Sequence, residues 1–218
     1  MKKLLLFIVA LAMSAFCTGQ VVNLNLARNW SYLKWYSYDE NSGEHFRGYK
    51  ETLSGNFISA DVEFSIRKYF GLSVETGFMQ QKGEKEYWGM TGYNGGGIIH
   101  AKTKLTYLLF STALIVKYPV QNKLIPYISF GPRLNYLVAH KNESDRMLNM
   151  ETLVPGIFGK VGVNYNWSRF IIGINAACHL NFKKISTHPS YPGLSGFVPE
   201  EHTYAKTLIS GISIGYRL

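Results

Sequence analysis

Long apolar runs are almost absent from this sequence of 218 residues. The one clear run, from Leu4 to Phe16, has 13 residues and contains a single serine. A helix that crosses a membrane needs about 20 apolar residues, and no later stretch approaches that length. The sequence beyond Phe16 therefore predicts no transmembrane helix.

The short apolar run has the features of a segment that is removed after export. Two lysines precede it and the small residues of Cys17–Gly19 follow it, which is the pattern of a secretory signal peptide. We predict that residues 1–19 are the signal peptide and that residues 20–218 form one exported domain. The alternative is a lipoprotein signal, but bulky Phe16 stands before the cysteine, where such signals have a small residue.

Cysteine, proline and acidic residues are also scarce. Once the signal is removed only Cys178 remains, so the exported domain cannot hold an internal disulfide. With 7 Pro against 21 Gly and 15% aromatic residues, the composition suits many strands with tight turns, not disorder or a helical bundle. The 23 basic residues outnumber 14 acidic ones, which in an exported chain indicates anionic lipid or polysaccharide more than nucleic acid.

Hydrophobicity in the exported domain alternates with a period of two residues. Between Ile58 and Ile66, for example, every second residue is apolar and the residues between are polar. Such alternation predicts strands with one face toward water or a polar interior and the other toward an apolar environment. The pattern recurs in eight segments: 22–32, 58–67, 70–78, 110–118, 124–138, 153–165, 169–183 and 207–218.

The connections between these segments alternate in length. The short ones are 67–69, 119–123 and 166–168, and the long ones are 39–52, 83–100, 140–149 and 185–203. Outer-membrane barrels have tight periplasmic turns and long external loops. The sequence therefore predicts an all-β fold, an eight-stranded antiparallel up-and-down transmembrane β-barrel in the bacterial outer membrane.

Alternation alone does not say which face of each strand points into the barrel. The polar face carries Gly, Asn, Arg and Glu, which suit a narrow lumen filled by side chains. We therefore expect the apolar face to contact lipid. The opposite assignment gives the alternative of a soluble, lipocalin-like barrel that binds a ligand inside.

Several short motifs resemble those of the PorT-like family, small outer-membrane β-barrels of Bacteroidota. The stretch Leu109–Tyr118, a short turn and then Ile125–Pro132 is similar to an apolar strand ending in Lys-Tyr, followed by Pro-Tyr and Gly-Pro. Phe78–Gly83 and the closing Gly215–Arg217 also resemble that family, although Leu218 replaces its usual terminal aromatic residue. The resemblance implies an eight-stranded barrel, and some members of the family assist protein secretion.

The predicted inward face carries an unusual number of charges. Because buried charges must be paired and hydrogen-bonded, we expect a salt-bridge network that fills the lumen. Its members would be Asp61, Glu63, Glu75, Lys117, Arg133, Lys160, Arg169, His179 and Arg217. The alternative is a narrow channel, which would favour anions because the bases outnumber the acids.

Signals for catalysis or for a cofactor are weak. A lipid-modifying enzyme would need a histidine and a hydroxyl or carboxylate group together at the outer rim, and no such pair shares one strand face. His188, Glu200, Glu201 and His202 match no metal-binding spacing. We therefore predict no enzyme, cofactor or metal, and a structural or interaction role. The expected partners are outer-membrane lipid, the barrel-assembly machinery, and an envelope protein or glycan at the external loops.

Overall fold

A computed structural model describes residues 20–39, 43–90, 96–120, 123–142, 149–188, 191–193, 196–198 and 200–218. The predicted signal peptide lies outside these ranges. Eight long strands make up the fold: β1 (Gln20–Asp39), β2 (Gly43–Arg67), β3 (Phe70–Met90), β4 (Gly96–Lys117), β5 (Leu124–Asn142), β7 (Leu153–Trp167), β8 (Phe170–Asn181) and β12 (Glu200–Arg217). Four short strands complete it: β6 (Asn149–Met150), β9 (Ser186–His188), β10 (Tyr191–Gly193) and β11 (Gly196–Val198).

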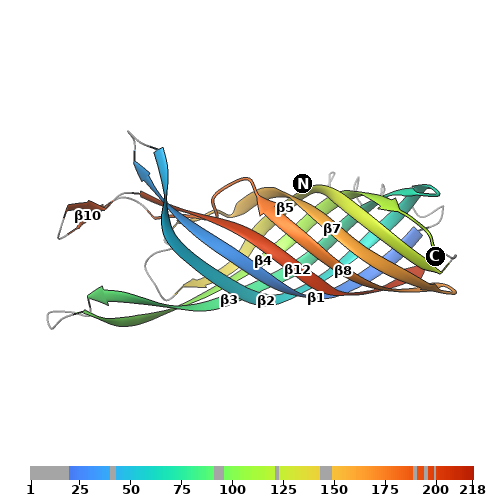
Figure 1. The fold of residues 1–218 in the computed structure, drawn as a ribbon, viewed down its shortest axis with the longest axis horizontal. Helices are drawn as coiled ribbons and strands as arrows, with labels where there is room; N and C mark the ends of the chain where they lie inside the picture. The colour runs from blue at the N-terminus through green and yellow to red at the C-terminus, as the bar shows by residue number, and fades with distance from the viewer. Residues whose placement is uncertain are drawn as a thin grey trace, which may run out of the picture.

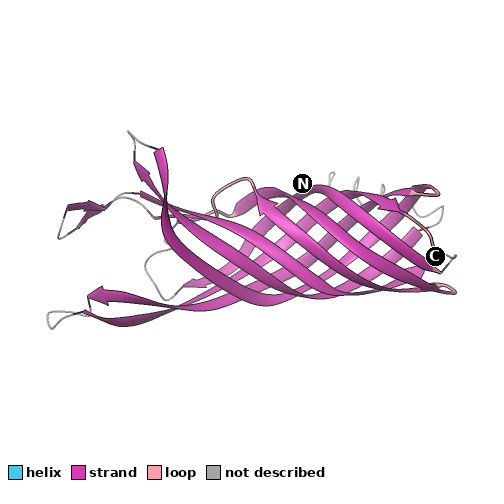
Figure 2. Cartoon of the chain, in the orientation of Figure 1, coloured by secondary structure: helices cyan, strands magenta, loops and turns pink. Residues whose placement is uncertain are grey.

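The eight long strands close into a barrel. Each pairs antiparallel with its neighbour along the chain, and β1 pairs with both β2 and β12. Closure removes the unpaired edges that an open sheet would leave. Figure 1 shows the strands crossing the barrel obliquely, and the described part of the chain contains only strands and connections (Figure 2). The predicted eight-stranded antiparallel barrel is confirmed.

The outer surface of the barrel is an apolar belt. Ile58, Phe78, Phe130 and Ile174 are each more than half exposed, and similar residues occupy the outward positions of all eight strands. Exposing so large a continuous apolar surface to water is unfavourable, whereas contact between that surface and lipid is favourable. The apolar face therefore points outward as predicted, and the lipocalin-like alternative is wrong. No helix in the described residues is long and apolar enough to cross a membrane.

The segments predicted as long loops are largely strands. β1 and β2 remain paired as far as Asp39 with Gly43, and β3 and β4 remain paired as far as Met90 with Gly96. These stretches hold Tyr, Trp, Thr and Ile but no proline, which favours continued antiparallel pairing. The β1–β2 ladder continues past one register shift between Lys34 and Tyr36. Figure 1 shows both hairpins reaching well beyond the body of the barrel at its left end.

The opposite end of the barrel has the short turns that the sequence predicts. β2 and β3 are joined through Lys68 and Tyr69, and β7 and β8 through Ser168 and Arg169. Ser168 has a φ of 57°, the left-handed conformation that a tight hairpin turn demands. We call this end the turn end and the other the hairpin end. From the usual asymmetry of outer-membrane barrels, we expect the hairpin end to face the outside.

The wall is interrupted once between β4 and β5. Their pairing passes from Ser111 with Arg133 directly to Leu114 with Phe130, which leaves Gly131 and Pro132 without a partner on β4. Proline has no N–H group to donate to a neighbouring strand. A hollow of about 520 Å³ opens at this seam, and inward-facing Ala113 and Phe158 take part in its lining. The two strands remain in contact at this seam, because a Cβ on Gly131 would meet the Thr112 carbonyl oxygen at 1.9 Å.

Candidate functional site

The barrel interior holds most of the charged residues that the sequence selects. Asp61, Glu63, Glu75, Arg133 and His179 are buried on inward strand positions. The side chains of Lys117 and Lys160, which also face inward, are 17% and 13% exposed. These seven residues come from strands β2, β3, β4, β5, β7 and β8, so the interior gathers them from most of the wall.

Two predicted members lie elsewhere. Arg169 is exposed in the turn between β7 and β8, where its Nη1 donates a hydrogen bond of 3.4 Å to the hydroxyl oxygen of Tyr216. Arg217 is exposed as the last residue of β12. Their assignment to the lumen is wrong, because the wall ends at these positions and side chains there reach water.

Two amide side chains hold Asp61 in the half of the interior nearest the turn end. Asn23 Nδ2 donates to Asp61 Oδ2 at 2.8 Å, and Asn25 Nδ2 donates to Asp61 Oδ1 at 2.7 Å. Asn25 Nδ2 also lies 3.2 Å from Ser59 Oγ. A buried carboxylate whose two oxygens both accept hydrogen bonds keeps much of the stabilisation that water would give it.

Two ion pairs complete this part of the interior. Glu75 Oε2 lies 3.2 Å from Lys160 Nζ and accepts a hydrogen bond of 3.4 Å from Ser111 Oγ, and Ser59 Oγ donates to Glu75 Oε1. Glu63 pairs with Lys117 close to the turn end. We call Asp61, Glu63, Glu75, Lys117 and Lys160 the charged layer. A cavity of about 30 Å³ among these side chains has room for about one water molecule.

The amides and hydroxyls of this network were missing from the predicted set. These residues occupy polar positions of the alternating strands, so the pattern places them inside: Asn23, Asn25, Ser59 and Ser111. The predicted lumenal network included charged residues only and therefore left them out. The signal that could have identified these amides and hydroxyls is a carboxylate on the same face, such as Asp61. A buried carboxylate needs hydrogen-bond donors, and these must come from nearby positions on its own or neighbouring strands.

Arg133 and His179 lie deeper toward the hairpin end. Arg133 Nη1 donates to Asn135 Oδ1 at 2.8 Å, and its Nη2 donates to Asn181. The ring of His179 meets Phe57 and Phe158 edge to face, at centroid distances of 6.4 and 5.7 Å. Among the described residues no carboxylate pairs with Arg133, so amide oxygens rather than an ion pair hold this cation.

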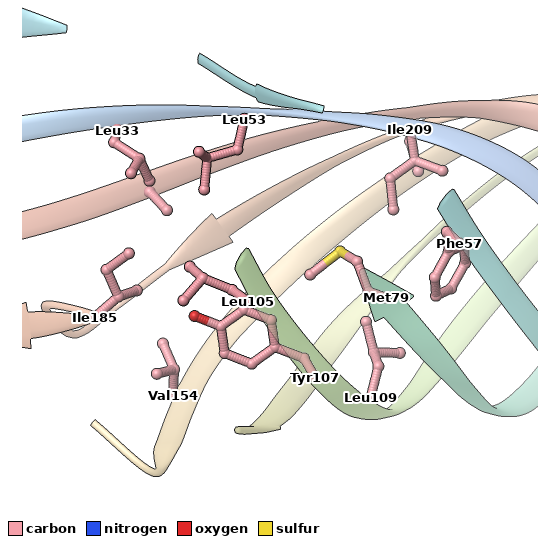
Figure 3. Close-up of a cluster of buried hydrophobic side chains, with 12 residues drawn as sticks. Leu33, Leu53, Phe57, Met79, Leu105, Tyr107, Leu109, Val154, Ile185 and Ile209 are labelled. Carbon is pink, nitrogen blue, oxygen red and sulfur yellow. The ribbon is translucent and has the colours of Figure 1, made fainter. Parts of the chain in front are cut away.

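The half of the interior nearest the hairpin end holds a packed apolar cluster beside buried polar side chains. Gln81 Nε2 donates to Ser31 Oγ, and Ser31 Oγ lies 2.5 Å from Thr207 Oγ1. Figure 3 shows side chains from several strands pointing toward one another across the lumen. We call the set the apolar plug: Leu33, Leu53, Phe57, Met79, Leu105, Tyr107, Leu109, Val154, Ala177, Ile185, Ala205 and Ile209. Leu33, Leu53 and Val154 are fully buried, so the plug is packed.

A short segment closes the plug from the hairpin end. After β8 the chain turns inward so that Ile185 is only 2% exposed within the plug. Its N–H donates to the carbonyl of Thr203 at 2.7 Å, and its carbonyl accepts from the N–H of Glu151 at 2.9 Å. Strands β6 and β9 pair beside it. This segment belongs to the predicted loop 185–203, yet it is part of the core.

The histidines and acids considered for metal binding or catalysis do not converge in the described structure. His140 is exposed, and His202 Nε2 lies 2.9 Å from Lys184 Nζ. The side chains of His188, Glu200 and Glu201 lie outside the described set. Among the described residues no group of three potential metal ligands occurs.

No protein-family model and no curated protein sequence matches the chain. Solved structures do. The chain is similar to the outer membrane protein OprG from Pseudomonas aeruginosa, with a TM-score of 0.58, 16% identity, and coverage of 92% of this chain and 95% of that one. The chain has a lower similarity to the outer membrane protein AlkL (TM-score 0.48, 12% identity, coverage 92% and 90%) and to a major outer membrane protein from Thermus thermophilus (TM-score 0.48, 12% identity, coverage 88% and 99%). The chain has the fold of a small outer-membrane β-barrel.

Proposed function

We propose that this barrel is an outer-membrane scaffold that presents its long hairpins to envelope partners and does not conduct solutes along its axis. The filled interior carries the proposal. The charged layer crosses the lumen near the turn end, and the apolar plug crosses it near the hairpin end. An ion that moved along the axis would have to leave water and pass fully buried leucines, which is strongly unfavourable.

The hairpins supply the surface for such a role. The β1–β2 and β3–β4 ladders continue beyond the apolar belt, so they offer rigid strand pairs in place of loose loops. Rigid elements lose less conformational entropy when a partner binds. The resemblance to PorT-like barrels agrees with an accessory role in secretion or envelope assembly, with an envelope protein or glycan as partner. Insertion would require the barrel-assembly machinery. We propose no catalytic activity, metal or cofactor.

A conductance measurement tests the closed lumen. The purified protein is reconstituted in planar lipid bilayers, with insertion verified by its altered mobility on a detergent gel before and after boiling. We expect no stepwise conductance. A variant with Leu33, Leu53 and Leu105 all replaced by serine is the matched comparison, since it opens the plug and leaves the outer wall unchanged. Steady, anion-selective conductance of the unmodified protein would show that it is the channel of the alternative reading.

A second measurement tests the role of the hairpins. Residues 84–101 are replaced by a two-residue turn, which removes most of the β3–β4 extension and leaves the barrel body intact. We expect unchanged gel mobility but loss of cross-linked envelope adducts in cells. Adducts that persist unchanged would mean that this extension is not the interaction surface.

A different role is favoured by the seam between β4 and β5. The hollow there is lined almost entirely by apolar residues, and inward-facing Ala113 and Phe158 take part in its lining. Passage of a small apolar molecule between the plug and the membrane at this point would require β4 and β5 to separate, and it would avoid the charged layer. The second candidate function is therefore lateral passage of small apolar solutes.

Substituting Pro132 tests this second role. Pro132→Val restores an N–H group that can pair with β4, and the expected result is slower entry of a small aromatic dye into vesicles that contain the barrel. Pro155→Val, on the outward face of the neighbouring strand, is the matched control. Equal entry rates for wild type, both variants and protein-free vesicles would remove lateral passage from consideration.

A further inference from the structure

Two lysines stand directly opposite each other on the outer wall of the barrel. Lys82 of β3 and Lys104 of β4 are partners across the β3–β4 ladder, and both are exposed. Their chain neighbours Gln81, Thr103 and Leu105 are buried inside the barrel, so the two lysines point away from the lumen. Like charges on directly opposite residues, whose Cβ atoms lie about 4.5–5.5 Å apart, repel one another and destabilise a sheet. A negatively charged group bound between the two ammonium groups would offset that repulsion.

Neither lysine has a partner that compensates its charge. Within the part of the chain that the structure describes, no hydrogen bond or ion pair involves Lys82 or Lys104. The other ladder partner of Lys82 is Ser54, which is neutral. The other ladder partner of Lys104 is Lys141, which already has an interaction partner and is therefore left out of the site. The ammonium groups of Lys82 and Lys104 are thus available to a ligand.

The lysine pair stands at the edge of the apolar belt. The outward ladder pairs of β3 and β4 change from mostly apolar to polar toward the hairpin end. From the turn end they are Leu72 with Leu114, Val74 with Thr112, Thr76 with Phe110, Phe78 with Leu108, Gln80 with Thr106, and then Lys82 with Lys104. Both strands therefore change at the same level, from hydrocarbon through neutral hydrogen-bonding side chains to two cations. Cations in this position lie at the level of lipid head groups.

The uncompensated charge is confined to one row of the ladder. One step farther from the belt the ladder pairs Lys102 with Glu84, residues of opposite charge. Beyond that pair the two strands continue as the projecting hairpin (Figure 1). A ligand complementary to this surface therefore carries its negative charge in a single group and has hydrocarbon on the side of the belt.

We propose that Lys82 and Lys104 together bind the phosphate of an acylated lipid in the leaflet at the hairpin end. A phosphate monoester has three acceptor oxygens and a charge of about −1.5 to −2, so one group can bridge both ammonium groups. Gln80 and Thr106, which lie between the lysines and the belt, supply further hydrogen-bond donors, and the acyl chains lie against the belt. The inference goes beyond the proposed scaffold role, because it names a ligand and a site on the wall.

The test is lipid binding by the purified full-length barrel in neutral detergent, measured by native mass spectrometry. The probes are bis-phosphorylated lipid A and the same lipid with both phosphates removed. We expect one tightly bound phosphorylated lipid per barrel, and about thirtyfold weaker binding when Lys82→Gln and Lys104→Gln are combined. Lys82→Arg with Lys104→Arg keeps both charges and should keep binding. Displacement of the lipid by inorganic phosphate at the same concentration would identify free phosphate as the ligand and overturn the lipid assignment.

The matched control combines Lys183→Gln and Lys206→Gln, which removes the same charge. These exposed lysines lie toward the hairpin end, but neither has another lysine as its ladder partner. This variant should bind the phosphorylated lipid like the unmodified protein. Equal losses in both double variants would show general attraction to a basic surface and overturn the site, as would unchanged binding in the Lys82→Gln/Lys104→Gln variant.

Stability gives a second readout of the same site. Without lipid A, Lys104→Gln alone should unfold at a higher urea concentration than the unmodified protein, because it removes the repulsion with Lys82. Added bis-phosphorylated lipid A should stabilise the unmodified protein more than this variant. A variant that is less stable without the lipid would contradict the repulsion on which the site rests. Gel mobility before and after boiling establishes that each variant is folded, and the bilayer conductance measurement tests the scaffold role separately.

Discussion

The two halves of the barrel interior are filled by different chemistry inside one continuous wall. Near the turn end, charges and amides form the charged layer, in which each carboxylate has a partner. Near the hairpin end, leucines and aromatic residues form the apolar plug. Both halves belong to the same eight ladders with the same inward alternation. A narrow barrel can therefore be filled by paired charges, or by packed hydrocarbon beside neutral hydrogen-bonded side chains such as Ser31 and Gln81, and the choice changes along its axis.

The two fillings should respond differently to substitution. A charge in a low-dielectric interior is stable only with its partner. Removing one member of an ion pair therefore leaves the other buried, with nothing to offset the free energy of its desolvation. An apolar side chain loses contacts in proportion to the volume removed, and its neighbours keep theirs. The predictions below use this difference and run from the largest expected effect to the smallest.

Glu75→Ala should give the largest loss of stability. It removes the carboxylate that lies 3.2 Å from Lys160 Nζ, and the loss of one member of a buried ion pair costs about 3–5 kcal/mol. Urea unfolding of the barrel in lipid vesicles, followed by tryptophan fluorescence, measures the change. The matched control combines Glu75→Leu with Lys160→Met, which removes both charges and should unfold at a higher urea concentration than Glu75→Ala. A double variant that is less stable than the single one would contradict the charged-layer interpretation.

Leu105→Ala tests the plug in the same assay. Leu105 is 1% exposed, and its truncation should cost about 2–5 kcal/mol through lost contacts and the cavity left behind. In contrast to Glu75→Ala, the loss should not depend on ionic strength. Leu108→Ala, on the lipid-facing side of β4, is the control and should cost much less. Similar losses for both variants would mean that the plug is not packed.

Val74→Arg tests whether charge is tolerated only on the inner face. Val74 is 53% exposed on the lipid-facing surface and follows the inward residue Ser73. An arginine near the middle of the belt should cost about 2–4 kcal/mol. Val74→Leu, the control of similar size, should leave stability unchanged. An arginine variant as stable as the leucine variant would show that this position lies outside the membrane.

Lys117→Gln should have the smallest effect of the four. The Lys117–Glu63 pair lies close to the turn end, and the lysine side chain is 17% exposed, so water screens the pair in part. We expect a loss of about 1–2 kcal/mol that diminishes as salt is added. Lys160→Gln, at the deeper pair, should be less sensitive to salt. Equal salt dependence at both positions would remove the distinction between the mouth and the centre of the layer.

Much of this architecture can be predicted from the sequence, because strand alternation and connection length are local signals. The alternation places Asp61 and Glu75 on the polar face of their strands, and the Gly, Asn, Arg and Glu content of that face identifies it as the inner one. The plug was not predicted, although its signal is present: at Leu108–Leu109 and Phe78–Met79 two apolar residues stand in succession, so both faces of the strand are apolar there. Such breaks in the alternation mark places where the inward face changes from polar to apolar.

Other features, such as strand ends and the path of the chain after β8, depend on three-dimensional contacts that the alternation of polar and apolar residues does not reveal. Arg169 and Arg217 stand at sequence positions that alternate with the inward residues, but they lie where the barrel wall ends. Predicting their exposure would require knowing at which residue each strand ends. Ile185 enters the core only because the chain after β8 leaves its ladder and β9 takes its place against β12. A hollow on the outer wall beside Leu180 and Lys206 has the same origin, and no local pattern in the sequence marks it.

The pairing of β1 with β12 has a consequence for the order of folding. Val21 meets Arg217, residues separated by almost the whole described chain, so this pairing has the greatest sequence separation of the eight ladders. Contacts at such sequence separation impose a large loop-closure entropy and slow the search for the native state. Until the last strand arrives, the two edges at β1 and β12 are open and prone to pair with other chains. A partner that shields those edges during biogenesis would act at this seam, and the rate of closure sets how long its protection is needed.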